Sequence, residues 1–190
     1  MGGEARPLRA DAQRNRERIL DAAEVVVARD GLSASMRAIA QHAGVGLGTI
    51  YRNFPTQEAL YAAVIIDRTQ RLIDEADTSL AADDPGAAFF DYFTRIVVDA
   101  TRKKTLADVL TQAGVDPKAG TADVSRDMRN VIERLLVRAQ EAGAVRQDLR
   151  MPELLALLAA ACLAAERNQW SEELRARTLA FVFDGLRSQR

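Results

Sequence analysis

The sequence predicts an all-α protein of about nine helices. Residues of high helix propensity, above all Ala, Leu, Arg and Glu, dominate a chain of 190 residues in which only 5% are aromatic. Hydrophobic residues make up 48% of the chain, which is enough for a substantial core. The five prolines are far apart, and none interrupts a strong helical period. No segment shows the pattern expected of a β-strand.

The first part of the chain divides into a short arm and three helices. Residues 1–10 lack apolar periodicity and are expected to form a flexible arm. A helix then runs to Gly31, and Ser35 offers a hydroxyl cap to a short second helix that ends at Gly44. Pro55 ends the third helix. The three predicted helices span residues 11–30, 36–43 and 47–54.

The rest of the chain predicts six more helices. Thr56 is a suitable cap for the first of them, residues 80–86 form the clearest break, and Pro152 suits the first turn of the penultimate helix. These helices are expected over residues 57–75, 89–100, 106–113, 124–139, 152–165 and 171–186. The predicted parts of the chain are an arm over 1–10, a small helical domain over 11–57 and a larger helical domain over 58–190.

The small domain meets the steric requirements of a helix-turn-helix motif. Two helices that cross over a short turn need a small residue on the first helix, a glycine in the turn and apolar residues around both. Ala40 is the small residue, Gly44 lies in the turn, and Ile50 follows on the second helix. The other apolar positions of the pattern are Ile39, Ala43 and Val45. The motif predicts that residues 47–54 enter the major groove of DNA.

The charge distribution permits this role. The formal net charge of −1 hides an asymmetry, because residues 1–57 carry eight arginines against six acidic residues. DNA affinity depends largely on neutralised phosphates, so a basic end favours DNA binding. An ordinary solvated tail has the same composition and is the alternative interpretation.

The residues around the motif carry a family resemblance. The chain reads ILDAA at residues 19–23 and GLSASMRAIAQHAGVGLGTIYRNFPTQEALYAAV at residues 31–64. These segments resemble the TetR/AcrR regulators, whose usual form is close to IAxxAGVSxGTxYxxFxxKExL. The resemblance is specific over about residues 15–65 and looser beyond, where AGAVRQDLRMPELLALLAA is similar to a stretch of many family members. It implies an all-α homodimer, an operator of two half-sites and a variable ligand cavity.

The resemblance also implies which residues contact DNA. Those positions are Ser35, Arg37, Gly46, Leu47, Gly48, Thr49, Tyr51, Arg52, Asn53 and Gln57. Arg37 and Arg52 can contact guanine at two points, and Tyr51 is expected at a phosphate. Both arginines have the alternative of a solvated helix face. Three positions depart from the usual pattern of the family. Gly46 stands where the family usually has serine, Gln57 where it usually has lysine, and Asn53 where histidine is frequent.

The larger domain carries aromatic and sulfur residues at helical spacing. Packing alone explains them, but an apolar ligand pocket uses the same residues, and the resemblance places a cavity among the middle helices. The expected lining residues are Phe89, Phe93, Met128 and Cys162. The last two helices are so apolar that either an unusually apolar core or a four-helix dimer interface is needed to cover them. The expected interface residues are Leu154, Leu158, Phe181 and Phe183.

These features predict a ligand-responsive transcriptional regulator, a repressor that a small, largely hydrophobic effector releases from a palindromic operator on double-stranded DNA. The alternative is a ligand-binding or protein-interaction module that has lost specific DNA binding, an interpretation that Gly46 and Gln57 favour. One histidine, one cysteine and no paired carboxylates at a recognisable cleft leave no catalytic constellation, so no enzyme is expected. We expect neither a metal nor a cofactor, because His42 has no second ligand nearby and the glycine string after residue 43 follows a helix.

The sequence predicts a cytoplasmic protein without a membrane partner. The longest apolar run, residues 154–165, is well short of the roughly 20 residues that cross a bilayer. No signal peptide is recognisable at the N-terminus. Cys162 is the single cysteine and cannot form an intramolecular disulfide, which suits a reducing compartment.

Overall fold

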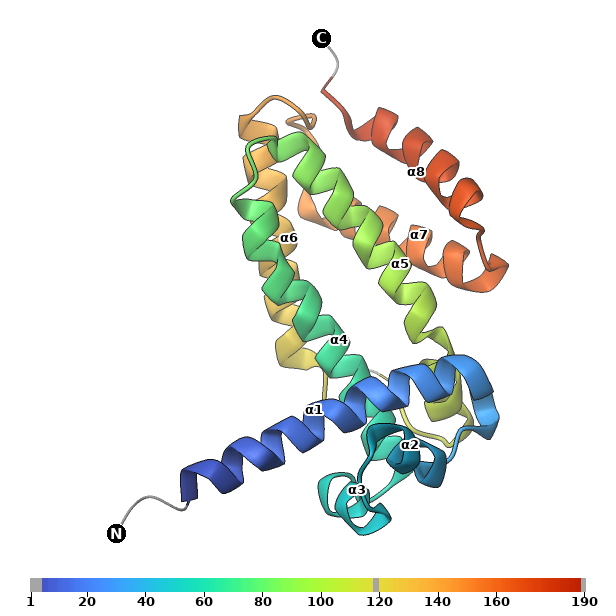
Figure 1. The fold of residues 1–190 in the computed structure, drawn as a ribbon. Coiled ribbons are helices and arrows are strands. Elements are labelled where there is room, and N and C mark those ends of the chain that lie inside the picture. The colour runs from blue at the N-terminus through green and yellow to red at the C-terminus, as the bar shows by residue number, and fades with distance from the viewer. Residues whose placement is uncertain (1–4, 118–119, 189–190) are drawn as a thin grey trace. The chain divides into compact units, whose positions relative to one another are not determined.

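The computed structural model describes residues 5–117 and 120–188, and over these residues it contains eight α-helices (Figure 1). They are α1 (Ala5–Asp30), α2 (Met36–Ala43), α3 (Leu47–Asn53), α4 (Gln57–Leu80), α5 (Pro85–Gln112), α6 (Ala122–Glu141), α7 (Met151–Asn168) and α8 (Glu172–Leu186). A 3-10 turn, Gly31–Ser33, joins α1 to α2. The all-α fold class is confirmed, with eight helices in place of about nine.

The helices differ most from the prediction at α5 and at the start of α1. The expected helices over 89–100 and 106–113 are parts of α5, which continues through the polar residues 101–105. These residues interrupt the apolar periodicity, but none is a glycine or proline that would break the backbone hydrogen bonding. Residues 5–10 of the predicted arm belong to α1, because the first turn of a helix needs no apolar face and tolerates Pro7. Residues 1–4 of that arm lie outside the described residues.

The described residues form two compact units. The first contains residues 5–67 and 105–117, and the second contains residues 68–104 and 120–188. The predicted boundary at residue 57 therefore misses the end of α5, which supplies Leu106 and Leu110 to the core of the first unit. Local periodicity cannot reveal this arrangement, because the contributing segments are far apart in the sequence.

The core of the first unit is built on α1, whose residues Ile19, Ala23 and Val26 are fully buried. The short helices α2 and α3 each add one completely buried isoleucine, Ile39 and Ile50. Helices this short are marginal in isolation, so burial of these side chains is what holds them in place.

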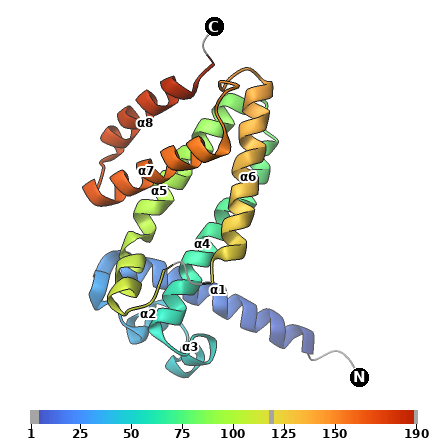
Figure 2. The ribbon, with the colours of Figure 1, turned by 180° about the vertical axis from the view of Figure 1, so that it is seen from behind.

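The second unit is a helical body in which α7 and α8 follow one another as a hairpin (Figure 2). Phe183 of α8 packs against Phe90 and Phe93 of α5, with ring centroids 4.7 and 5.4 Å apart. A Cβ at Gly86 would lie 2.6 Å from the Cβ of Ala144, so the start of α5 requires glycine for this close approach. Within the described residues, no helix combines the length and the apolar character needed to span a bilayer.

Candidate DNA-binding surface and effector pocket

The turn between α2 and α3 has the geometry that the sequence motif requires. The hydroxyl of Ser35 caps α2 by accepting a hydrogen bond from the backbone N–H of Ala38 at 3.2 Å. Gly44 ends α2 in the left-handed conformation, with φ at 64°, where a side chain would be strained. Val45 then donates its backbone N–H to the carbonyl of Ala40 at 3.0 Å. The turn is therefore fixed by backbone geometry, and it sets the direction in which α3 leaves.

The residues around α3 present a polar and exposed face. Tyr51 is 48% exposed, and Arg52 is also exposed, with its guanidinium donating to the Thr49 hydroxyl at 3.1 Å. The amide of Asn53 donates to the carbonyl of Thr49 at 2.9 Å and so closes the last turn of the helix. The other predicted DNA contacts that are exposed are Ser35, Arg37, Gly46, Leu47 and Gly48. Nine of the ten predicted contacts thus lie on or beside one exposed part of the first unit.

Gln57 differs from this group. Its side-chain amide donates to the carbonyl of Ala34 at 2.9 Å and to the hydroxyl of Tyr61 at 2.6 Å. An amide NH2 has two donors, and both are used within the protein. The Gln57 side chain therefore connects the start of α4 to the segment before α2, and its amide donors are not free to bind a phosphate.

Two arginines of α1 have a role that the sequence did not reveal. The guanidinium of Arg18 donates to the carbonyl of Ala43 at 2.6 Å and lies near the carbonyl of Gly44 at 3.4 Å, at the C-terminus of α2. A cation at this end of a helix is favourable because the last carbonyls carry partial negative charge. The guanidinium of Arg16 lies over the ring of Phe54, 4.7 Å from its centroid. Part of the basic charge near the N-terminus thus holds the helix-turn-helix together.

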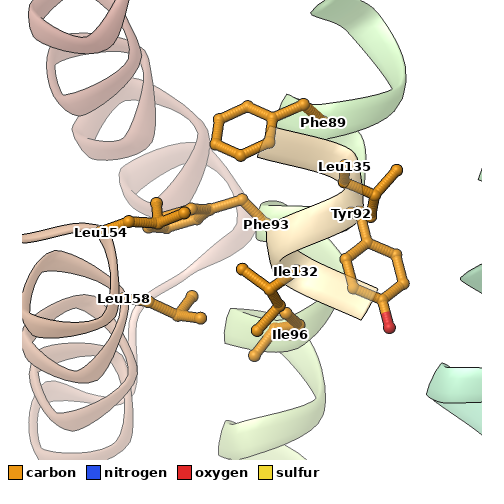
Figure 3. A pocket seen from close by; sticks show the side chains of 8 residues that line it. All are labelled: Phe89, Tyr92, Phe93, Ile96, Ile132, Leu135, Leu154 and Leu158. Atoms are coloured by element: carbon orange, nitrogen blue, oxygen red, sulfur yellow. The ribbon is translucent and has the colours of Figure 1, made fainter. Parts of the chain in front are cut away.

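An apolar pocket lies inside the second unit (Figure 3). Eight side chains line it, namely Phe89, Tyr92, Phe93 and Ile96 of α5, Ile132 and Leu135 of α6, and Leu154 and Leu158 of α7. The cavity volume is only about 10 Å³, which is room for about one water molecule. The pocket is closed in the sense that its own side chains fill it, so any effector larger than water requires the surrounding side chains or helices to move.

The pocket contains two of the four predicted ligand-binding residues. Phe89 and Phe93 line it, whereas Met128 and Cys162 do not. The sulfur of Met128 lies 3.4 Å from the hydroxyl of Tyr92, which also donates to the backbone carbonyl of Leu72 at 2.9 Å. Cys162 follows Leu158 by one helical turn, and burial raises the pKa of its thiol to about 11. The sequence missed the other lining residues because a periodic apolar stripe does not distinguish a pocket wall from a filled core.

The predicted dimer interface needs correction. Leu154 and Leu158 line the pocket and are buried within the chain, so they are core residues of one protomer. Phe183 is half-buried against Phe90 and Phe93, whereas Phe181 is 77% exposed. The large apolar side chains that α7 and α8 leave exposed are Leu157, Leu163, Leu174 and Phe181. The sequence could not select the outer face of α7, because this helix is apolar nearly all round.

A small group of charged residues lies within the body. The guanidinium of Arg68 donates to Oδ1 of Asp99 through Nε at 2.9 Å and lies 2.7 Å from it through Nη2. The ammonium of Lys103 lies 2.6 Å from Oδ2 of the same carboxylate and donates to the hydroxyl of Thr69 at 3.1 Å. Among the described residues, Oδ2 of Asp99 accepts no well-aligned hydrogen bond, so its contact with Lys103 is an ion pair. We call Arg68, Thr69, Asp99 and Lys103 the charged cluster.

Together, the helix-turn-helix and the helical body define a class of protein, the helix-turn-helix regulators with an all-helical second domain. The family model for bacterial regulatory proteins of the tetR family matches residues 19–64. A second model, described as transcriptional regulator SbtR-like, C-terminal domain, matches residues 84–188. The chain belongs to the TetR family, which confirms the prediction of a DNA-binding transcriptional regulator.

Individual relatives agree with this assignment. The chain is 31% identical over 147 residues to the HTH-type transcriptional repressor KstR of Mycobacterium tuberculosis, and the aligned part covers 74% of this chain and 66% of that repressor. A TetR transcription regulatory protein from Mycobacterium vanbaalenii is 39% identical with a TM-score of 0.78, over 95% of this chain and 99% of that one. A TetR transcriptional regulator from Streptomyces coelicolor is 36% identical with a TM-score of 0.75, over 92% and 99%.

Proposed function

We propose that this chain is a homodimeric repressor, released from a palindromic operator by a small, largely hydrophobic effector. The observation that carries the proposal is that the same chain contains a closed apolar pocket and an exposed α3, the recognition helix that is expected to enter the major groove. The similarity to the repressor KstR supports repression over activation. This role requires the protein to share a compartment with the chromosome, which in a bacterium is the cytoplasm.

DNA contact is assigned to the exposed residues around α3. Arg37 and Arg52 are positioned to read bases or bind phosphates, and Tyr51 to bind a phosphate. Leu47 and Thr49, in the first turn of α3, would approach the base edges, with the glycines on either side of Leu47 allowing close approach of the backbone. The assignment rests on exposure, on position in the motif and on the family pattern.

Dimerisation is assigned to the exposed apolar face of α7 and α8. Phe181, Leu157 and Leu163 would be buried against the same residues of a second copy, as a two-fold axis requires. Ala159 and Ala160 are also exposed and leave room for close approach of the helices. A dimer presents two recognition helices, which is why the operator is expected to be a palindrome.

The closed pocket suggests how the effector acts. An effector shifts a conformational equilibrium only by as much as it prefers one state over the other. The pocket has no room for an effector, so an effector would bind only the state in which α5, α6 and α7 have moved apart. This preference for one state is the source of the regulation. Displacement of α4 is expected to accompany this change and to alter the spacing of the two recognition helices.

Selection of bound sequences from random duplex DNA, at roughly physiological salt so that simple charge attraction is suppressed, tests the proposal. Recovery of a palindrome is expected, and that sequence then becomes the probe for effector screening. If a folded dimer selects no sequence, the proposal fails in favour of a ligand-binding module without specific DNA binding. If an operator is found but no pocket-opening compound weakens binding to it, the effector part of the proposal fails alone.

A further inference from the structure

The apolar pocket and the charged cluster are consecutive along two helices. On α5, Ile96 lines the pocket, and Asp99 and Lys103 follow it at helical spacings of three and four residues. On α7, Leu158 lines the pocket and Cys162 follows four residues later. Cys162 is within electrostatic reach of Lys103 and Asp99, so both helices lead from the pocket to the same group of charges. The charged cluster therefore lies beyond one end of the pocket along α5 and α7, although the eight residues that line the pocket are all apolar.

The stability of the fold alone does not explain the charged cluster, because burying its charges costs hydration free energy. The Asp99 side chain is 9% exposed, that of Arg68 13% and that of Lys103 21%, so all three charges have lost most of their water. Loss of hydration often cancels the attraction within a buried ion pair, and apolar residues of similar volume are commonly as stabilising. Charged groups gathered next to a cavity are instead a common feature of binding sites.

Lys103 has hydrogen-bonding capacity to spare. Its ammonium group has three donors, and within the described residues it engages two partners, the Asp99 carboxylate and the Thr69 hydroxyl. An oxygen acceptor at the end of a molecule in the pocket would satisfy the third donor. Asp99 and Glu166 are among the acids near this position, and Arg68 and Lys103 are among the bases, so an acceptor bound here meets charges of both signs.

We propose that Lys103 is an effector-binding residue, and that it selects effectors carrying a carbonyl or carboxylate oxygen at one end of an apolar body. This inference rests on the proposed effector pocket and names the chemical class that the pocket takes. The oxygen accepts from the third donor of Lys103, which keeps its contacts with Asp99 and Thr69. Since Thr69 and Arg68 belong to α4 whereas Asp99 and Lys103 belong to α5, the polar end of the effector binds where these two helices are tied together within the body.

The test uses matched triplets of phenylalkyl and n-alkyl compounds, each a carboxylate, a methyl ketone and a primary amine on the same apolar body. Their dissociation constants are measured by calorimetry and thermal shift with the full-length protein and no DNA. Lys103→Met removes the charge and donors but keeps the apolar stem, and Arg102→Met is the matched control at an exposed neighbour. Lys103→Arg keeps the charge and the hydrogen-bond donors. It therefore distinguishes loss of these groups from a general disturbance of the structure by substitution at this position.

We expect the carboxylate or the ketone to bind wild type, Lys103→Arg and Arg102→Met about 10- to 100-fold more tightly than the amine. In Lys103→Met this preference disappears. Equal or tighter binding of the amines, a preference that survives in Lys103→Met, or binding by no member of the series would each overturn the inference. Operator binding is measured separately on the same samples, so a protein that shows the preference but binds no operator refutes the proposed function and leaves the assignment of Lys103 intact.

Discussion

The helix-turn-helix unit and the helical body differ in whether the residues proposed for function are exposed or buried. In the first unit, the side chains proposed to meet DNA lie on the surface, over a core in which Ile39 and Ile50 are completely buried. In the body, the residues that line the pocket are themselves core residues, and Leu154 is as inaccessible as Ile50. A surface site can change without loss of the fold, whereas a site within the core must open before it binds anything.

This difference suits a protein that binds DNA in its resting state and responds to a second molecule. The DNA-binding surface is preformed, because caps and turns fix it independently of any ligand. The pocket is closed, so effector binding has to supply the free energy that opens it. Substitutions on the DNA-binding surface should therefore change operator affinity without changing the stability of the fold. Substitutions of pocket residues should change both effector affinity and stability.

The largest expected effect comes from the core of the first unit. Ile50 is the buried residue of α3, and Ile50→Ala should lower the free energy of unfolding by about 2–5 kcal/mol and abolish operator binding. Leu47→Ala, on the exposed side of the same helix, should change stability by less than about 0.5 kcal/mol and weaken only operator binding. Thermal unfolding measures the change in stability of both variants, and operator titration measures the change in their affinity for DNA. Equal destabilisation would remove the distinction between core and DNA-binding face.

The next effect concerns the surface that the body leaves uncovered. Phe181→Glu should weaken the dimer by at least about 2 kcal/mol, or about thirtyfold in its dissociation constant, because an interface anchor is lost and like charges meet across a two-fold axis. Val137→Glu introduces the same charge on an exposed apolar position of α6 and serves as control. Sedimentation over a concentration series measures the change. A dimer indifferent to Phe181→Glu would place the interface elsewhere.

A smaller effect separates residues that touch DNA from residues that position the motif. Arg52→Ala should cost about 1–3 kcal/mol of operator affinity, and either reduce the salt slope by about 1 or relax base preference at one operator position. Arg18→Gln removes the charged cap on α2 and should weaken binding to all sequences with the salt slope unchanged. Operator titrations over a salt series distinguish the two results. An altered salt slope in Arg18→Gln would make Arg18 a phosphate contact.

Most of the helix-turn-helix could be predicted because its requirements are local. Ala40, Gly44 and Ile50 lie within one stretch of sequence, and each is required by the geometry of a single turn. Arg18 was missed because its partner, Ala43, is 25 residues away and gives no local signal. The hydrogen bonds of Gln57 were missed because a family position identifies the residue that usually binds a phosphate, but not the partners that a different side chain finds within the protein.

The body was less predictable because its helices are apolar on more than one face. Phe89 and Phe93 could be placed in the pocket, yet Leu154 and Leu158 have the same character as the exposed Leu157. Only the tertiary structure decides which of these leucines faces inward. In an amphipathic helix, periodicity indicates which apolar residues face the core. It gives no such indication for a helix that lacks a polar face.

The mildest perturbation probes whether the body is closed in solution. Burial raises the pKa of the Cys162 thiol to about 11, with nearby acidic groups adding to the effect, so the thiol is protonated at neutral pH. Because only the thiolate reacts, alkylation by iodoacetamide should accelerate about tenfold per pH unit from pH 7 toward the raised pKa. The chain unfolded in guanidinium supplies the rate of an ordinary cysteine, and Cys162→Ser supplies the blank. A native rate at pH 7 equal to the unfolded rate would mean that this part of α7, one turn beyond the pocket, is open to water, and the contrast between the two units would then not hold.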